Sequence, residues 1–336
     1  MTDRAPTLAD IRSTAERLAP HVLRTPVMPW LGPTMARLLG PDARVHMKLE
    51  LFQATGTFKA RGAMTTALRI AEAGKPRGLT AASAGNHAIA TAWAARRLGV
   101  PAKVVMVKTA NPFRVALAES EGATVIKADD AVAAFAEVER IVSADGFVAV
   151  HPFEGHAVAC GTGTLGAELL DQVPDLDAVV VSIGGGGLAG GLSHAIKLIK
   201  PSCLVLGVEP KGADAMSRSI AAGHPIRLDR VDTIADSLAP PMALPYAFGL
   251  CRAAIDEIVT LDDDQICAGL ALMQLEAKLA VEPAAGAAAA ALFGPFRKRL
   301  FGKRVGLIVC GANIDGMTYG RHLGRGLAAL PNLISD

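Results

Sequence analysis

The sequence predicts an α/β fold with two open, mostly parallel sheets that are flanked by helices. Short runs of β-branched and apolar residues alternate with alanine-rich helical patterns along most of the 336 residues. Parallel strands need a crossover connection and are buried on both faces, so this alternation indicates βαβ units. Polar or glycine-rich motifs follow several of these strands, where open α/β sheets bind their ligands.

The first half of the chain alternates regularly after an amphipathic helix within residues 1–20. In order, the pattern predicts a strand and helix over 78–99, a strand over 102–107, a helix over 113–122, a strand over 123–128, a helix over 131–146 and a strand over 147–151. Pro152 and Gly155 then interrupt the pattern, so we expect a structural boundary near residues 151–155.

The second half repeats the theme, with strands predicted over 178–183, 203–210 and 305–310. Residues 178–196 carry no formal charge for nearly the length of a membrane span, but the glycines in their middle favour a buried strand, loop and helix. The alanine-rich helix over 283–293 predicts tight helix packing.

Composition argues for a small-molecule enzyme or binding protein. Hydrophobic residues make up 51% of the chain, and 34 basic against 32 acidic residues leave a net charge of only +2. Because the charges are scattered, they form no basic patch that could bind nucleic acid or an anionic membrane. The five cysteines lack CxxC spacing and the N-terminus lacks a signal peptide, so a reducing cytoplasm is expected.

One lysine lies in an unusual setting, within residues 50–63. A lysine amine becomes a nucleophile toward aldehydes when apolar surroundings or nearby cations lower its pKa. Phe58 offers Lys59 a packing surface, and Arg61 would be a second cation close by. The local composition also fits a solvated lysine beside a core phenylalanine.

A glycine-rich turn follows the strand over 178–183. The run from Gly184 to Gly187 opens a helix, where backbone N–H groups and the helix dipole favour a phosphate, although a tight turn alone would also need small residues. Gly185, Gly187 and Gly190 match G-x-G-x-x-G with Glu209 about 20 residues on, so a nicotinamide or flavin site remains an alternative.

Polar residues follow other predicted strands. Ser83 to His87 could hold a carboxylate, but they also fit an N-cap and turn in which His87 is structural. Cys310 ends the strand over 305–310, where a buried structural cysteine is the other interpretation. Glu282 is a carboxylate between apolar residues, or an ordinary charge in a first helical turn.

Taken together, these segments resemble the serine/threonine dehydratase family, the fold-type-II enzymes that use pyridoxal 5'-phosphate. The resemblance covers nearly the whole chain in the family's order: ELFQATGTFKARGA, SAGNH, GGGGLAGG, GVEP, KLAVEPAAGA and CGAN. It implies a tryptophan-synthase-β-like fold with the cofactor in the cleft between two domains. The large domain would comprise residues 1–52 and 152–336, and the small, mobile domain residues 53–151.

The resemblance also implies roles for the cofactor site. Lys59 would bind the cofactor aldehyde covalently, and Phe58 would pack beside the pyridine ring. Asn86 would hydrogen-bond the ring hydroxyl, and Cys310 would face the pyridine nitrogen as a weak partner suited to β-elimination. The phosphate would be held by backbone N–H groups of Gly184, Gly185, Gly186, Gly187 and Leu188. Glu282 is assigned to the same cofactor site.

The implied reaction removes water from L-threonine, L-serine or a related β-hydroxy amino acid and gives a 2-keto acid and ammonia, as in threonine ammonia-lyases. The freed Lys59 amine would take the α-proton. The substrate carboxylate would be received by Ser83, Ala84, Gly85, Asn86 and His87. Racemising relatives place a second serine at the position of Ala84, so efficient racemisation is not expected. A catabolic role is expected, because no regulatory domain follows CGAN, and a homodimer is expected because that is usual in the family.

A divalent cation site of the family would use Glu209 and the carbonyl of Ala213, with Mg²⁺ or Ca²⁺ as the ion. Ala215 stands where a second carboxylate would be, beside Asp214. The resemblance therefore implies a cation site of which this sequence matches two ligands, Glu209 and the Ala213 carbonyl, and lacks the second carboxylate.

Several alternatives concern the substrate and the class. Residues 129–136 lack the cation that relatives acting on dicarboxylates can carry, while the proline-rich residues 236–246 resemble dehydratases of hydroxyectoine breakdown. A specialised substrate of that type, or 3-hydroxyaspartate, is thus an alternative to threonine and serine. A nicotinamide-dependent oxidoreductase and a non-catalytic amino-acid-binding protein are the alternatives from other classes.

Overall fold

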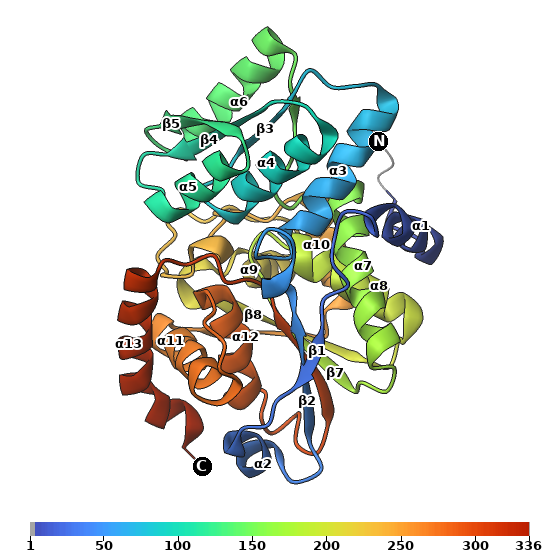
Figure 1. Cartoon of the computed structure of the whole chain (residues 1–336). Coiled ribbons are helices and arrows are strands. Elements are labelled where there is room, and N and C mark those ends of the chain that lie inside the picture. The colour runs from blue at the N-terminus through green and yellow to red at the C-terminus, as the bar shows by residue number, and fades with distance from the viewer. Residues whose placement is uncertain (1–3, 336) are drawn as a thin grey trace.

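The computed structural model describes residues 4–335 and contains two separate sheets (Figure 1). The larger sheet has the strand order β1-β2-β10-β7-β8-β9, and its edge strand β1 pairs antiparallel with β2 while the other pairs are parallel. Its strands are β1 (Val27–Pro29), β2 (Arg44–Leu49), β7 (Ala178–Ser182), β8 (Leu204–Pro210), β9 (Glu257–Leu261) and β10 (Arg304–Val309).

The smaller sheet is parallel throughout, in the order β5-β4-β3-β6. Its strands are β3 (Leu79–Ala82), β4 (Ala102–Val107), β5 (Ala123–Ala128) and β6 (Val148–Ala149). The predicted fold class, two mostly parallel sheets flanked by helices, is therefore confirmed. The exact division of the chain into a large and a small, mobile domain stays a prediction.

Helices cover both sheets, and Figure 1 shows α6 on one side of the smaller sheet and α4 and α5 on the other. The helices are α1 (Leu8–Leu18), α2 (Pro33–Leu39), α3 (Lys59–Ala73), α4 (Asn86–Leu98), α5 (Pro112–Ser120), α6 (Ala131–Asp145), α7 (His156–Gln172), α8 (Gly187–Ile199), α9 (Ala215–Ala222), α10 (Pro245–Ala254), α11 (Asp263–Leu272), α12 (Pro283–Phe293) and α13 (Gly316–Ile334). Short helical turns are η1 (Glu50–Phe52), η2 (Lys211–Ala213), η3 (Asp236–Leu238) and η4 (Met273–Ala277).

The alanine-rich helix α12 is buried along its whole length against the larger sheet. It approaches α11 so closely that a Cβ atom on Gly269 of α11 would lie 2.1 Å from the carbonyl oxygen of Gly286. The alanines thus reflect tight helix packing, as the sequence predicts.

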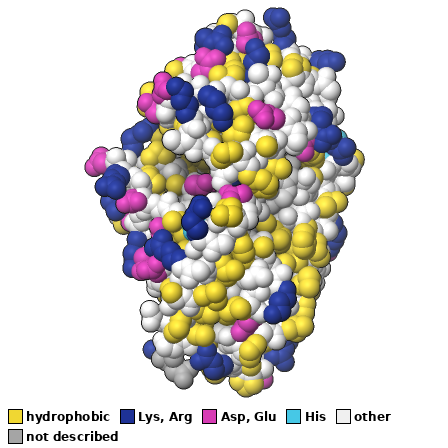
Figure 2. All heavy atoms as spheres, turned by 60° about the vertical axis from the view of Figure 1, so that its left-hand side comes forward, with side chains coloured by type: hydrophobic (Ala, Val, Ile, Leu, Met, Phe, Trp, Pro, Cys, Tyr) yellow, Lys and Arg dark blue, Asp and Glu magenta, His cyan; other side chains and the backbone are white. Residues whose placement is uncertain are grey.

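The uncharged residues 178–196 form β7 and most of α8, as predicted. Within residues 4–335 we find no helix with the length and apolar character that crossing a membrane requires. Figure 2 shows basic and acidic side chains intermixed over one face of the molecule, in agreement with the small net charge.

The chain crosses from the larger to the smaller sheet through α3, whose first turn is anchored by a buried ion network. Arg61 donates hydrogen bonds of 2.8 Å to both carboxylate oxygens of Glu50, and its Nη1 lies 3.0 Å from Glu168 of α7. Lys48 of β2 donates to the other oxygen of Glu168 at 2.5 Å. The Arg61 and Glu50 side chains are 1% and 0% exposed, so each charge depends on its partners.

We expect Glu50→Gln to lower the free energy of unfolding by about 3–5 kcal/mol, because it removes one of the two carboxylates that balance the buried charge of Arg61. Urea denaturation followed by circular dichroism measures this loss. The matched control is Asp171→Asn, which removes the exposed ion pair of Asp171 with Arg24 and should cost less than about 1 kcal/mol. Equal effects of the two substitutions would contradict the anchoring role of the network.

Candidate active site

The structure brings the predicted motifs together around one cavity between the two sheets. The glycine loop follows β7, Cys310 follows β10, Lys59 begins α3, Asn86 begins α4, and Glu282 precedes α12. The cavity is lined by Phe58, Lys59, Asn86, Phe153, Ser182, Gly184, Gly185, Gly186, Gly187, Leu188, Ser237, Leu238, Glu282, Ala284 and Cys310. All of the predicted cofactor-binding residues are in this set.

Lys59 is positioned by the backbone on either side of the cavity. Just before it, Thr57 forms a β-bridge with Gly311, and the Phe58 N–H donates to the Cys310 carbonyl at 3.1 Å. The Lys59 Nζ donates to the carbonyl of Pro152 at 2.5 Å and lies 5.2 Å from the centroid of the Phe58 ring. Loss of hydration in this surrounding lowers the pKa of Lys59 to about 8.

The expectation that Arg61 acts as a second cation beside Lys59 is wrong. Its guanidinium belongs to the buried network with Glu50 and Glu168, which balances its charge. Burial, rather than a neighbouring cation, is the cause of the lowered pKa of Lys59.

The glycine loop is a cradle of backbone N–H groups at the start of α8. Gly186 adopts the left-handed conformation with φ of +85°, and Phe153 packs directly against the loop. A Cβ atom on Gly185 would lie 2.5 Å from the Phe153 ring, and one on Gly187 would lie 2.6 Å from the Phe153 Cα. Glycine therefore permits this packing, and the first N–H groups of α8 stay available to an anion.

Asn86 lines the cavity, but its amide is engaged by other side chains. Its Nδ2 donates to the two oxygens of Glu282 at 2.9 and 3.0 Å, and its Oδ1 accepts from Asn313 at 2.9 Å. The predicted contact of Asn86 with a ring hydroxyl, like the other predicted roles of the site residues, stays a prediction.

The rest of the predicted carboxylate site lies on the same loop, just outside the residues that line the cavity. The Oγ of Ser83 accepts from the Gly85 N–H at 3.2 Å, and Ala84 is exposed. The His87 ring is buried and hydrogen-bonds the Val150 carbonyl at 2.8 Å, and burial lowers its pKa to about 3. The His87 side chain is thus structural in this arrangement. Of His87, the backbone N–H is the group that could bind a substrate carboxylate.

Arg114, a buried residue of α5 that no sequence motif indicates, reaches across the cleft. Its Nη2 lies 3.0 Å from Glu282, its Nε donates to the Asn313 carbonyl at 2.9 Å, and its Nη1 binds Asp236. Burial raises the pKa of Glu282 to about 7, although Arg114 acts in the opposite direction. No sequence signal distinguishes Arg114 from a surface residue of an ordinary helix.

Cys310 is a buried, neutral thiol at the end of β10. Its Sγ accepts from the Ser182 hydroxyl at 3.7 Å, and burial raises its pKa to about 12. A neutral group at this place is consistent with the weak ring partner that the sequence predicts.

Glu209 does not support a dinucleotide site, and its role as a metal ligand together with the Ala213 carbonyl stays a prediction. Its buried carboxylate accepts from the N–H groups of Met216 and Ser217 at 2.9 and 2.7 Å and from the Ser217 hydroxyl at 2.5 Å, so it fixes the start of α9. Ala213 lies nearby in η2, and Asp214 pairs with Arg218 at 2.8 Å. Residues 4–335 contain no group of three or more His, Cys, Asp and Glu side chains that could hold a metal ion.

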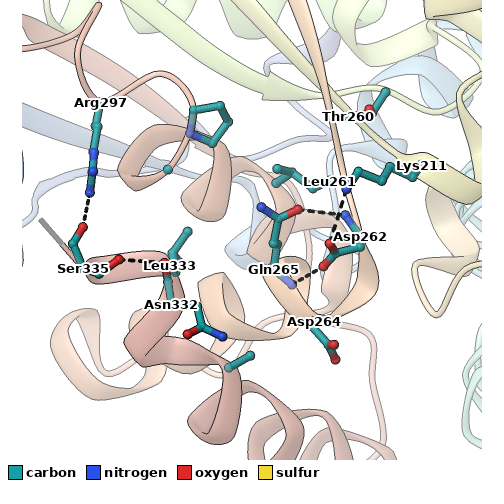
Figure 3. Close-up of a pocket in the computed structure, with 13 residues that line it drawn as sticks. Lys211, Thr260, Leu261, Asp262, Asp264, Gln265, Arg297, Asn332, Leu333 and Ser335 are labelled. Carbon is teal, nitrogen blue, oxygen red and sulfur yellow. Dashed lines mark hydrogen bonds and ion pairs between the residues drawn. The ribbon is translucent and has the colours of Figure 1, made fainter.

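A second pocket lies away from these motifs, between the ends of α11 and α13 (Figure 3). Its polar side chains are engaged locally: Gln265 and Asp262 exchange hydrogen bonds of 2.9 and 3.0 Å, Lys211 pairs with Asp262, and Arg297 binds the Ser335 carbonyl. This pocket contains none of the predicted site residues.

The arrangement around Lys59 fits a phosphorylated aldehyde such as pyridoxal 5'-phosphate. A buried amine of lowered pKa can condense with the aldehyde, and the N–H groups of the glycine loop can hold the phosphate. The ring would lie among Phe58, Ser182 and Cys310, which line the space between these two groups.

Comparisons with known proteins agree with this chemistry. Residues 18–311 match the family model described as "Pyridoxal-phosphate dependent enzyme". The chain is 47% identical over 325 residues to the phenylserine dehydratase of Ralstonia pickettii. The aligned region covers 97% of this chain and 98% of that protein. The chain is 33% identical to the L-threo-3-hydroxyaspartate ammonia-lyase of Saccharomyces cerevisiae, over 94% of this chain and 95% of that protein. The structure of maize serine racemase superposes with a TM-score of 0.88 at 34% identity, over 97% of this chain and 99% of that one.

We expect the apoprotein to bind pyridoxal 5'-phosphate at a rate that rises with pH around a midpoint near 8, rather than near the ordinary lysine value of 10.5. Burial lowers the pKa of Lys59, so the neutral, nucleophilic amine predominates above this midpoint and is protonated below it. Stopped-flow absorbance of the visible imine band measures the rate, with Lys59→Arg as the control that should give no band. A midpoint above pH 10 would contradict the role of burial.

Proposed function

The chain belongs to the family of pyridoxal-phosphate dependent enzymes, and we propose that it dehydrates a β-hydroxy amino acid with an uncharged aromatic side chain, of the 3-phenylserine type. The predicted class of activity, that of a dehydratase or ammonia-lyase, is confirmed by the relatives described above. The observation that carries the choice of side chain is the 47% identity to a phenylserine dehydratase along almost the entire chain.

The walls of the cavity support an apolar side chain. Beyond the residues assigned to the cofactor, Phe153 and Leu238 line it, and aromatic rings prefer edge or offset contacts with one another. A phenyl group of the substrate has such partners here, whereas a short polar side chain would leave apolar surface uncovered.

The charges around the cavity disfavour a second carboxylate. Arg114 is the cation that reaches the cleft from α5, and its charge is already balanced by Glu282 and Asp236. Residues 129–136, where dicarboxylate-specific relatives can carry an arginine, contain no cation. We therefore expect 3-hydroxyaspartate to be a poorer substrate than an aromatic β-hydroxy amino acid.

L-Threonine and L-serine are the second candidate, because the motifs resemble those of the serine/threonine dehydratases. A specialised substrate of the hydroxyectoine type stays an alternative that rests on the proline-rich residues 236–246. Elimination is favoured over racemisation, since Ala84 offers no hydroxyl that could act as a base on the face opposite Lys59.

The chain's own residues divide the work of the reaction. When bound, pyridoxal 5'-phosphate withdraws electrons from the substrate's α-carbon. The Lys59 Nζ, whose pKa is lowered by burial to about 8, accepts the α-proton once its amine is free and unprotonated. The loop from Ser83 to His87 orients the substrate carboxylate, and the glycine loop at the start of α8 holds the phosphate.

We also propose that the protein is a homodimer in a reducing cytoplasm. All five cysteines are buried free thiols, as expected where disulfides do not form. Sedimentation velocity should then give a species of twice the 34.7 kDa chain mass.

We expect ammonia release from L-threo-3-phenylserine with a kcat/KM about tenfold or more above that of L-threonine, because the phenyl group buries more apolar surface. A coupled ammonia assay with phenylserine, threonine, serine and 3-hydroxyaspartate measures the order. Lys59→Ala should abolish turnover of every substrate. A preference for 3-hydroxyaspartate would show that the assignment of the side chain is wrong.

A further inference from the structure

We propose that the hydroxyl of Ser237 binds the β-oxygen of the substrate, the atom that leaves as water. This inference rests on the proposed dehydratase function and assigns it a residue that recognises the leaving group. Within residues 4–335 the Ser237 Oγ is buried from solvent and has no hydrogen-bond partner. Burying a hydroxyl without a partner is unfavourable, so such a group in an active-site wall points to a ligand.

Ser237 lies where it can reach a bound substrate. It belongs to η3 and lines the same cavity as Lys59 and the glycine loop. The main chain of η3 lies against Gly184, since a Cβ atom there would be 3.2 Å from the Ser237 carbonyl oxygen and 3.1 Å from the Leu238 Cα. The turn that carries Ser237 therefore lies beside the phosphate cradle, in the wall of the cavity that Lys59 also lines.

The segment that carries Ser237 is held firmly. Asp236 binds Arg114 of α5 across the cleft, and the Leu238 N–H donates to the Ala235 carbonyl at 2.8 Å. Just before η3, the Thr233 hydroxyl donates to Asp263 at 2.6 Å. These contacts anchor the chain on both sides of Ser237.

The other polar side chains of the cavity already have partners. Asn86 is held by Glu282 and Asn313, and the Ser182 hydroxyl donates to Cys310. The backbone N–H groups of the glycine loop suit the phosphate, and those after Ser83 suit the substrate carboxylate. The β-oxygen is the substrate atom that still needs a donor, and Ser237 is the lining side chain with an unused hydroxyl.

A donor at this oxygen favours the reaction as well as binding. When the bond between the β-carbon and the oxygen breaks, the electron pair leaves with the oxygen, which takes up the proton that Lys59 removed from the α-carbon and departs as water. A hydrogen bond from Ser237 stabilises the charge that develops on the oxygen. The same contact selects for substrates that carry a β-hydroxyl. Ser237 therefore acts on specificity and on the elimination step together.

The test compares Ser237→Ala with the wild-type holoenzyme on a matched pair of ligands, phenylserine and phenylalanine, which differ in the β-oxygen. We expect kcat/KM for ammonia release from phenylserine to fall about tenfold, the worth of one hydrogen bond in the transition state. The inhibition constant of phenylalanine should be unchanged, because this ligand lacks the oxygen. Retention of the cofactor on dialysis and the thermal midpoint should also be unchanged.

The controls separate this role from others. Ser193→Ala removes a buried serine of α8 that donates to the Gly190 carbonyl, outside the cavity, and should leave the kinetics intact. Should Ser237→Ala fail to fold, Ser237→Gly removes the same hydroxyl. Three results would overturn the proposal. Weaker cofactor retention in Ser237→Ala would assign Ser237 to the phosphate, and an equal loss of affinity for phenylalanine would make its role steric. An unchanged kcat/KM for phenylserine would show that Ser237 has no role in the reaction.

These failures differ from a failure of the proposed function. If wild-type enzyme acts on threonine instead of phenylserine, the same comparison uses threonine and 2-aminobutyrate, with the same expected loss. If the wild type releases ammonia from no β-hydroxy amino acid, the dehydratase function is wrong. An active wild type with an unaffected Ser237→Ala overturns the inference about Ser237 alone.

Discussion

The buried ion network beneath the first turn of α3 is the constraint on which the site depends. Arg61 is fixed by Glu50 on one side and by Glu168 of α7 on the other, and Lys59 lies only two residues away. Charges in such a position need several partners in good geometry, which the structure provides with hydrogen bonds of 2.8 Å to both oxygens of Glu50. The network therefore fixes the register of α3 where the chain passes from one sheet to the other, and with it the place of the reactive amine.

Opposite this amine, the larger sheet supplies the groups that a phosphorylated cofactor needs. The glycine loop follows β7 and Cys310 follows β10, as expected for carboxyl ends of neighbouring parallel strands. Phe153 packs on the loop so closely that only glycine fits at positions 185 and 187. The smaller sheet adds Asn86 and the loop before it, and Arg114 ties α5 to Glu282 and Asp236. Covalent attachment, phosphate binding and substrate binding thus come from different elements that meet at one cavity.

The sequence predicts the parts of this site that are continuous in the chain. Lys59, the glycine loop and Cys310 are found because each motif combines a reactive or permissive residue with the end of a strand or the start of a helix. Long-range partners escape such reasoning: Arg114 looks like a surface residue, and Arg61 looks like a neighbour of Lys59 although its side chain binds Glu50 and Glu168. The interpretation of Glu209 as a ribose ligand fails for the same reason, since its partners at the start of α9 become evident only when the chain is folded.

Covalent attachment of the cofactor to Lys59 is the central requirement of the proposed function. Borohydride reduction of the holoenzyme, followed by proteolysis and mass spectrometry, tests this most directly. We expect a phosphopyridoxyl group on the peptide that carries Lys59 and on no other lysine peptide, in stoichiometric amount. Labelling of a different lysine, or no stable labelling after reduction, would contradict it.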